Sequence, residues 1–431
     1  MNKTRILTGI DIGSSKTTTI VGIPTDGEIK IIGVSSVPSK GIKRGQIVDI
    51  EEATQTVINS VEAAERMAGY NIDRAFVSLG GTHLSCQNST GVVAVAEPEG
   101  EIRPEDVDRV IEAAQAITLP SSREIIHVIP RSFTVDGQGG IKDPVGMAGV
   151  RLEVETHIVT AAATAVRNLE KCLFEAGVKI EDFIVSGLAA AESILTETEK
   201  ELGVVLVDIG GGVTNVVIFI EGSPFYTAVL PIGAKHIDSD LAIGLRVSLE
   251  TASKIKIALS QEERKPTLPQ GSKNLYQKKE EDEIDLSKWG IADEEKKVSK
   301  KTLIEGIIKP RLNEIFAMVE MEIKKSGAGG LTPAGVVICG GGAQTVGVIQ
   351  AAKKVLSAPV RIGYPQKISG LIDDVQTPDY ATAVGLLLYG LQQTEKEEVG
   401  FSFKQWGKKV PKIPIEGVAQ KAWQLIKNLL P

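Results

Sequence analysis

Two short stretches of this chain, nearly half its length apart, carry the same arrangement of residues that could do chemistry. Each has an apolar run, an aspartate, a glycine-rich bend, small hydroxyl or amide residues, and then β-branched residues; Asp11 and Gly13 mark the first copy, Asp208 and Gly210 the second. This pattern predicts a strand, a tight turn and a second strand. Glycines let backbone N–H groups approach an anion closely, and the preceding aspartate can hold Mg²⁺ through water. The two hairpins could therefore bind one polyphosphate from opposite sides.

A third glycine-rich turn strengthens this interpretation, because one aspartate–glycine turn alone is an ordinary hairpin signal. It comprises Gly340, Gly341, Gly342 and Ala343, which follow an apolar run and lead into a helix-like stretch ending near Val355. Glycines there would let a flat base lie against the backbone. Neither the P-loop motif nor the strand-linked dinucleotide fingerprint is present, so those two nucleotide folds are disfavoured.

The elements that must position these loops alternate between strand-like runs and helical periods, which predicts an α/β fold with parallel sheet segments. We expect a helix over residues 51–69, a buried strand over 75–79, a helix over 161–176 and an alanine-rich helix over 189–195. Between 82 and 160 the pattern changes to short strands and one acidic helix. That change predicts a small inserted module.

The last residues form a second strong pattern. On a helix over residues 415–431, the apolar face contains Ile415, Val418, Ala419, Ala422, Trp423, Leu425, Ile426, Leu429 and Leu430, and the opposite face is polar. From Val399 onward the chain contains six lysines and one glutamate, a net charge of +5, whereas the whole chain carries −7. Such a basic helix is typical of the surface of an anionic bilayer, and a helix docked on its own domain is the alternative.

Composition agrees with a soluble intracellular protein of more than one domain: 431 residues, 42% hydrophobic and 24% charged. The acidic balance and 4% aromatic content argue against nucleic acid as the main partner. Cys86, Cys172 and Cys339 lie far apart and are interpreted as reduced core residues. The four histidines lack metal-ligand spacing, and neither a signal peptide nor an apolar run of about 20 residues is evident. The polar stretch 261–301 is interpreted as a solvated surface excursion.

The three loops, in this order, resemble the two phosphate loops and the adenosine loop of the actin, Hsp70 and sugar-kinase superfamily. Together with the inserted module and the basic C-terminal helix, nearly the whole chain resembles the FtsA family of bacterial cell-division proteins. Supporting phrases lie at residues 187–189, 308–311 and 380–387. The resemblance implies an actin-like, two-domain ATPase fold with an inserted α+β subdomain. It also implies a protein that binds ATP and Mg²⁺ and polymerises on the cytoplasmic face of the cell membrane at the division site. There it would anchor FtsZ filaments.

Individual roles follow from the resemblance alone. Asp11 and Asp208 would organise Mg²⁺, and Lys256 would contact base or ribose, with Glu250 a substitute for the family glutamate that Ser253 replaces. Ser186 would occupy the place where hydrolytic relatives orient the attacking water. Because a hydroxyl is a poor base, we expect slow hydrolysis or little beyond nucleotide binding. The phosphate-binding residues would be Gly13, Ser14, Ser15 and Lys16 on the first hairpin and Gly210, Gly211, Gly212 and Thr214 on the second.

The resemblance also implies the partner contacts. Arg311 and Glu314 would lie at an interface with FtsZ or with a second copy of the chain, and the inserted module would serve filament contacts and other divisome proteins. Anionic lipid would contact Val418, Lys421, Ala422, Trp423, Leu425, Ile426, Lys427, Leu429 and Leu430.

The implied domain division has two discontinuous halves. Subdomain 1A would comprise 1–81, 161–200 and 358–392, subdomain 1C 82–160, subdomain 2A 201–232 and 302–357, subdomain 2B 233–301, the linker 393–414 and the membrane-targeting helix 415–431. A pilus-assembly scaffold of the PilM type remains an alternative, although we would not expect this amphipathic terminus there. A small-metabolite kinase would need a general-base carboxylate facing a second pocket, and no motif nominates one.

Overall fold

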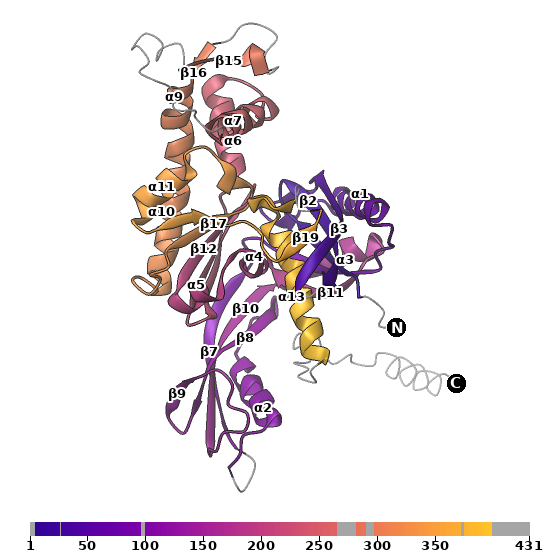
Figure 1. Ribbon diagram of the computed structural model, residues 1–431, viewed down its shortest axis with the longest axis vertical. Coiled ribbons are helices and arrows are strands. Elements are labelled where there is room, and N and C mark those ends of the chain that lie inside the picture. The colour runs from indigo at the N-terminus through magenta and orange to yellow at the C-terminus, as the bar shows by residue number, and fades with distance from the viewer. Residues whose placement is uncertain are drawn as a thin grey trace, which may run out of the picture.

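The computed structural model describes residues 5–25, 27–95, 100–264, 282–289, 297–371 and 375–398. Two α/β halves lie side by side, and a smaller module extends from one end of the molecule (Figure 1). The predicted C-terminal helix and most of the linker before it lie outside the described residues.

Each half contains one mixed β-sheet, and the two sheets repeat one plan. The first has the order β11 (Lys179–Val185), β6 (Arg74–Leu79), β1 (Leu7–Ile12), β2 (Lys16–Thr25), β3 (Glu28–Pro38), β19 (Ile368–Gly370). The second has the order β18 (Val360–Ile362), β17 (Val336–Cys339), β12 (Val204–Ile209), β13 (Thr214–Ile220), β14 (Ser223–Leu230). In both, the strand that precedes a glycine-rich turn has an antiparallel hairpin partner on one side and a parallel strand on the other. The two similar stretches of sequence therefore occupy equivalent positions in two sheets of the same plan.

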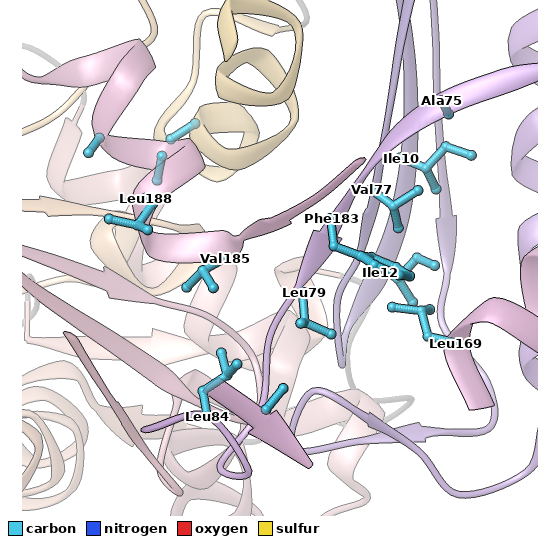
Figure 2. Close-up of a cluster of buried hydrophobic side chains, with 14 of the residues drawn as sticks. Ile10, Ile12, Ala75, Val77, Leu79, Leu84, Leu169, Phe183, Val185 and Leu188 are labelled. Atoms are coloured by element: carbon cyan, nitrogen blue, oxygen red, sulfur yellow. The ribbon is translucent and has the colours of Figure 1, made fainter. Parts of the chain in front are cut away.

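Helices cover the first sheet as the apolar spacing predicts. The helix α1 (Ile50–Ala68) begins at Asp49, whose side chain accepts from Glu52 N–H, and ends at Gly69 in the left-handed conformation. The other helices here are α3 (Ala163–Glu175), α4 (Ser186–Ile194) and α13 (Ala381–Glu398). Figure 2 shows the core between β1, β6 and their neighbours, where Ile10, Val77 and Val185 are fully buried. This apolar layer fixes the end of β1 from which the first glycine turn emerges.

Most helices of the second half lie beyond the second sheet, toward the end of the molecule away from the module (Figure 1). They are α6 (Ala234–Leu245), α7 (Leu249–Arg264), α9 (Lys300–Leu303), the π-helical turn η2 (Ile304–Ile308), α10 (Lys309–Ser326) and α11 (Val348–Leu356). The short helix α5 (Glu197–Leu202) lies at the other end, beside the module (Figure 1). The short strands β15 (Glu283–Asp285) and β16 (Lys297–Ser299), with the 3₁₀ turn η1 (Leu286–Trp289), occupy the described part of the polar stretch.

The inserted module is a four-stranded antiparallel sheet with one helix. Its strand order is β7 (Ser85–Ala94), β10 (Arg151–Ala162), β8 (Arg123–Val135), β9 (Gln138–Ile141), and α2 (Pro104–Gln115) packs on it. Ile102, Val110 and Leu152 form part of a core of its own. The strand β10 continues to Ala162, so the next helix begins two residues later than the sequence pattern placed it.

Candidate nucleotide site

The two glycine turns are hairpins of the same geometry. Residues Ile12 and Thr17 close the first hairpin, and Gly13 N–H donates to the carbonyl of Lys16 at 3.1 Å. In the second, Ile209 pairs with Thr214, and Gly210 N–H donates to the carbonyl of Val213 at 2.9 Å. Ser14 and Ser15 form one tip, Gly211 and Gly212 the other. The structure thus confirms the predicted strand–turn–strand units.

The tips of the two hairpins face each other across the boundary between the halves. A Cβ atom at Gly211 would lie 1.9 Å from Ser15 Oγ, and one at Gly212 would lie 3.0 Å from Ser14 Oγ. Glycine at position 211 is therefore required by close approach rather than by an unusual φ. Backbone from both halves can contact one small anion at this place.

A carboxylate precedes each turn, partly buried at Asp11 and buried at Asp208. Ser78 Oγ donates to Asp11 Oδ1 at 2.7 Å, and Asn215 Nδ2 donates to Asp208 Oδ2 at 2.8 Å. Burial raises the pKa of Asp11, and the Ser78 hydrogen bond offsets only part of that effect. Burial also raises the pKa of Asp208, to about 6, and the negative charge of Asp11 adds to the increase. The two aspartates are thus close enough to repel each other.

These residues fit a hydrated magnesium ion. Asp11 and Asp208 supply oxygen atoms, and the buried Asn215 Oδ1 has no hydrogen-bond partner. Within the described residues no group of three or more histidine, cysteine or acidic side chains could hold a metal ion. A cation between the two aspartates would accordingly take its remaining ligands from water and phosphate, which suits Mg²⁺.

Lys16 is engaged by residues from the far end of the chain. Its Nζ lies 2.5 Å from Asp379 Oδ2 and 3.7 Å from the centre of the Tyr380 ring, both on the 3₁₀ turn η4 (Pro378–Tyr380). Burial alone would raise the pKa of Asp379, but the Lys16 charge holds that pKa below its usual value. Gln344 Nε2 also donates to Asp379 Oδ1, at 2.6 Å. Asp379 therefore links the first phosphate hairpin to the third glycine loop.

The third loop lies beside the second carboxylate. Gly340 has φ of 79°, donates to the carbonyl of Pro378 at 2.9 Å, and would place a Cβ 2.3 Å from Asp208 Oδ1. The 3₁₀ turn η3 (Gly341–Gln344) follows, with Gly342 and Ala343 buried. A Cβ at Gly341 would meet nothing closer than Asp379 Cβ at 3.9 Å, so this position faces open space.

Lys256 and Glu250 have different surroundings. Lys256 Nζ on α7 lies 2.7 Å from Asp238 Oδ1 and donates to the carbonyl of Ala234 at 3.3 Å, both on α6. Glu250 is exposed and pairs with Lys254 at 2.8 Å, so the structure does not bring it to Lys256. Asp238 was not singled out by its sequence pattern. The Thr214 hydroxyl, predicted to bind phosphate, instead donates to the carbonyl of Ile232 at 2.8 Å within the second half.

Lys235 is a second residue that sequence reasoning missed. It lies in the first turn of α6, whose Ala234 and Lys235 N–H groups donate to the carbonyls of Gly210 and Gly211, both at 2.9 Å. Its Nζ donates to the carbonyl of Ser14 at 2.7 Å, across the boundary between the halves. Desolvation lowers the pKa of its ammonium group. No local pattern marks this contact, because its partners are 221 residues apart.

Ser186 and the pair Arg311–Glu314 lie in other surroundings. Ser186 begins α4, and a Cβ at Gly80 would lie 3.0 Å from its Oγ. Among the described residues its hydroxyl has no hydrogen-bond partner. Arg311 on α10 makes two hydrogen bonds to Asp240 on α6, at 2.6 and 2.8 Å, and also contacts Glu314. This cluster joins helices of the second half.

The repeated sheets and facing hairpins define an actin-like protein. A structure titled as a PilM–PilN type IV pilus biogenesis complex matches 89% of this chain and 98% of its own at a TM-score of 0.62 and 15% identity. MreB5 of Spiroplasma citri bound to AMPPNP matches 92% of this chain and 99% of its own at a TM-score of 0.52 and 14% identity. Both likenesses concern the fold.

Sequence comparison then gives the family. Residues 81–160 match a family described as the SHS2 domain inserted in FtsA, and residues 205–385 match cell division protein FtsA. The chain is 38% identical over 413 residues to the cell division protein FtsA of Pseudomonas aeruginosa, covering 95% of each. The chain belongs to the FtsA family of cell-division proteins. Across the described ranges, no helix combines the length and apolar character needed to cross a bilayer.

Proposed function

We propose that this FtsA-family protein binds ATP with Mg²⁺ between its two halves. The observation that carries the proposal is the tip-to-tip meeting of two hairpins, each preceded by an aspartate whose pKa is raised by desolvation. The nucleotide analogue named with the MreB5 structure gives further support through the shared fold. Mg²⁺, when bound, would supply positive charge between the carboxylates and the phosphates.

The surrounding residues have separable roles in this proposal. Backbone N–H groups of Ser14, Ser15, Gly211 and Gly212 would bind phosphate oxygens, Lys16 and Lys235 would add positive charge, and the open face at Gly341 would receive the base. Ser186 would hold water without accepting its proton, so hydrolysis would be slow. Nucleotide would then act mainly as a ligand that holds the halves together.

We also propose that the protein polymerises on the cytoplasmic face of the cell membrane at the division site and anchors FtsZ filaments there. Family membership supports FtsZ and self-association as partners. The amphipathic pattern of residues 415–431, with its net positive surroundings, supports anionic lipid as the docking surface. The anchor would be the apolar face around Trp423.

The inserted module would contact a second copy or other division proteins. A groove of about 580 Å³ separates it from the second half, with Arg131 and Lys142 on the module and Glu197, Glu201 and Glu221 opposite. Lys142 Nζ and Glu201 Oε2 pair across it at 2.7 Å. Charged walls of both signs favour a polar partner segment over an apolar one.

Calorimetry tests the nucleotide proposal. Full-length protein should bind ATP, and omission of Mg²⁺ should weaken binding. Lys16→Met should weaken binding by about 10- to 100-fold, because a hydrogen bond to a charged group is worth about 1.5–3 kcal/mol. Lys30→Met is the control, since this exposed lysine on β3 pairs with Ile23, near the end of β2 that is remote from the glycine turn. Equal effects of the two variants would contradict the site.

Vesicle co-sedimentation with anionic lipid tests the anchor. The full chain should pellet with vesicles, whereas a chain ending at Pro414 and the Trp423→Glu variant should remain in solution. Gln424→Glu introduces the same charge on the polar face of the predicted helix and should pellet nearly as well as the unmodified chain. Equal pelleting of all four proteins would make the segment a self-docking or partner helix.

A further inference from the structure

A small hairpin, β4 (Ile42–Lys43) and β5 (Gln46–Ile47), contacts both glycine hairpins of the candidate site. Its Gly45 N–H donates to Ser14 Oγ at 2.8 Å, on the first tip. A Cβ at Gly212, on the second tip, would lie 3.3 Å from the backbone nitrogen of Arg44. The turn of this third hairpin therefore lies where the two phosphate hairpins meet.

Arg44 occupies an unusual backbone conformation in that turn. Its φ is 49° and that of Gly45 is 69°, so both central residues are left-handed, as a tight type I′ hairpin requires. Glycine, asparagine or aspartate would adopt this conformation at less cost than arginine, for which it is worth about 1–2 kcal/mol of strain. Strain of this kind, retained beside the proposed nucleotide site, points to a side chain with a function.

The guanidinium group of Arg44 is available for a ligand. The residue is exposed, and among the described residues it has no ion pair or side-chain hydrogen bond. Two other cations near the hairpin tips are engaged, Lys16 by Asp379 and Lys235 by the carbonyl of Ser14. Arginine presents planar, bidentate donors that match phosphate oxygens.

We propose that Arg44 binds the terminal phosphate of a nucleoside triphosphate and thereby distinguishes triphosphate from diphosphate. This inference rests on the proposed nucleotide site. The backbone of Arg44 lies one residue from the Ser14 contact and beside the Gly212 tip. Its side chain therefore starts at the phosphate end of the proposed site, whereas the base would lie at the third loop.

The test is calorimetric titration of full-length protein with ATP and with ADP, each with Mg²⁺. Arg44→Gln should lose about 10- to 100-fold in ATP affinity and less than about 3-fold in ADP affinity, because a charge-assisted bond to one phosphate disappears. Lys43→Gln is the matched control, since it removes the adjacent exposed cation, and it should retain the ATP/ADP ratio.

Arg44→Gly separates charge from backbone strain. It should lose triphosphate preference as Arg44→Gln does, while its thermal unfolding temperature stays at or above that of the unmodified protein. An unchanged ATP/ADP ratio in Arg44→Gln, or an equal loss in Lys43→Gln, would overturn the assignment. If the unmodified protein bound neither nucleotide, the proposed nucleotide site itself would fail, and Arg44 with it.

Discussion

Lys16 lies between the carboxylate of Asp379 and the ring of Tyr380, so any phosphate that binds the first hairpin must compete with these partners. The glycine-rich hairpins were predictable because each is local, with strand, turn and strand contiguous in sequence. Partners such as Asp379, 363 residues away from Lys16, were not, because no periodicity or turn signal encodes a contact between distant segments. Lys235 was missed for the same reason, since Ser14 is 221 residues away from it.

Removal of the Asp379 charge should strengthen ATP binding. In Asp379→Asn the Lys16 ammonium is no longer shared with a carboxylate, and one negative charge near the phosphates is lost. We expect the Kd for ATP to fall about 3- to 10-fold, as for a partly exposed ion pair worth about 1 kcal/mol. Calorimetry at low and high salt measures the change, which should shrink as salt rises. Weaker ATP binding would instead mean that Asp379 positions Lys16 for phosphate.

Substitution by alanine should affect two adjacent glycines to very different extents. Gly340→Ala combines a positive φ with a Cβ 2.6 Å from the carbonyl oxygen of Ile209, so it should destabilise the protein by about 2–4 kcal/mol. Gly341→Ala meets only Asp379 Cβ at 3.9 Å and should stay within about 0.5 kcal/mol. Urea unfolding measures both. Similar stability of the two variants would show that the loop relaxes freely.

At the scale of elements, the inserted module is joined to the second half by a polar cluster on β7, β10 and β14. His157 Nδ1–H donates to Asn88 Oδ1 at 2.8 Å, which leaves Nε2 to accept from the Thr227 hydroxyl at 3.0 Å. Asn88 Nδ2 donates to the carbonyl of Phe225 at 3.2 Å. The change in sequence pattern to short strands and one acidic helix predicted the existence of the module. Its docking surface could not be predicted, because the alternating strand pattern around His157 gives no sign of a contact with the second half.

Acid should weaken this junction. Burial lowers the pKa of His157 to about 3, with the charge of Arg131 assisting, whereas the unfolded chain has a pKa of 6.5. The unfolded state therefore binds more protons between these values, so stability rises with pH through this window and is lost as pH falls below 6.5. From pH 7 to pH 5 this residue should contribute a loss of about 2 kcal/mol.

The comparison of His157→Gln with the unmodified protein measures that loss, because glutamine can keep a hydrogen bond but cannot titrate. Urea unfolding at pH 7 and pH 5 should show a smaller pH difference in the variant. His127, whose burial lowers its pKa to about 4, still titrates in both proteins and provides the common background. An equal change in the free energy of unfolding between pH 7 and pH 5 in the two proteins would show that His157 does not cause the loss.

At the scale of the whole molecule, the two repeated sheets place their glycine turns opposite each other, and ligand binding between them is expected to stabilise the assembly of halves. A ligand whose free concentration is 100 times its Kd stabilises the folded state by about 2.7 kcal/mol. Turnover should remain well below the range of about 1–100 per second found for kinases, because the only polar group at the start of α4 is the Ser186 hydroxyl. Phosphate release at kinase-like rates in a single-enzyme assay would contradict this expectation.

The partner surface that we expect on α10 can be tested separately from the stability of the same helix. Arg311 is bound to Asp240 through two hydrogen bonds, so Arg311→Asp removes a structural contact as well as any contact with FtsZ. The double variant Arg311→Asp, Asp240→Arg restores the ion pair with its charges exchanged. We expect the single variant to lower the unfolding temperature and the double variant to recover it, while both fail to co-sediment with FtsZ filaments. Recovery of FtsZ binding along with stability would show that Arg311 acts only by joining α10 to α6, and exposed Glu314 would then be the residue to test.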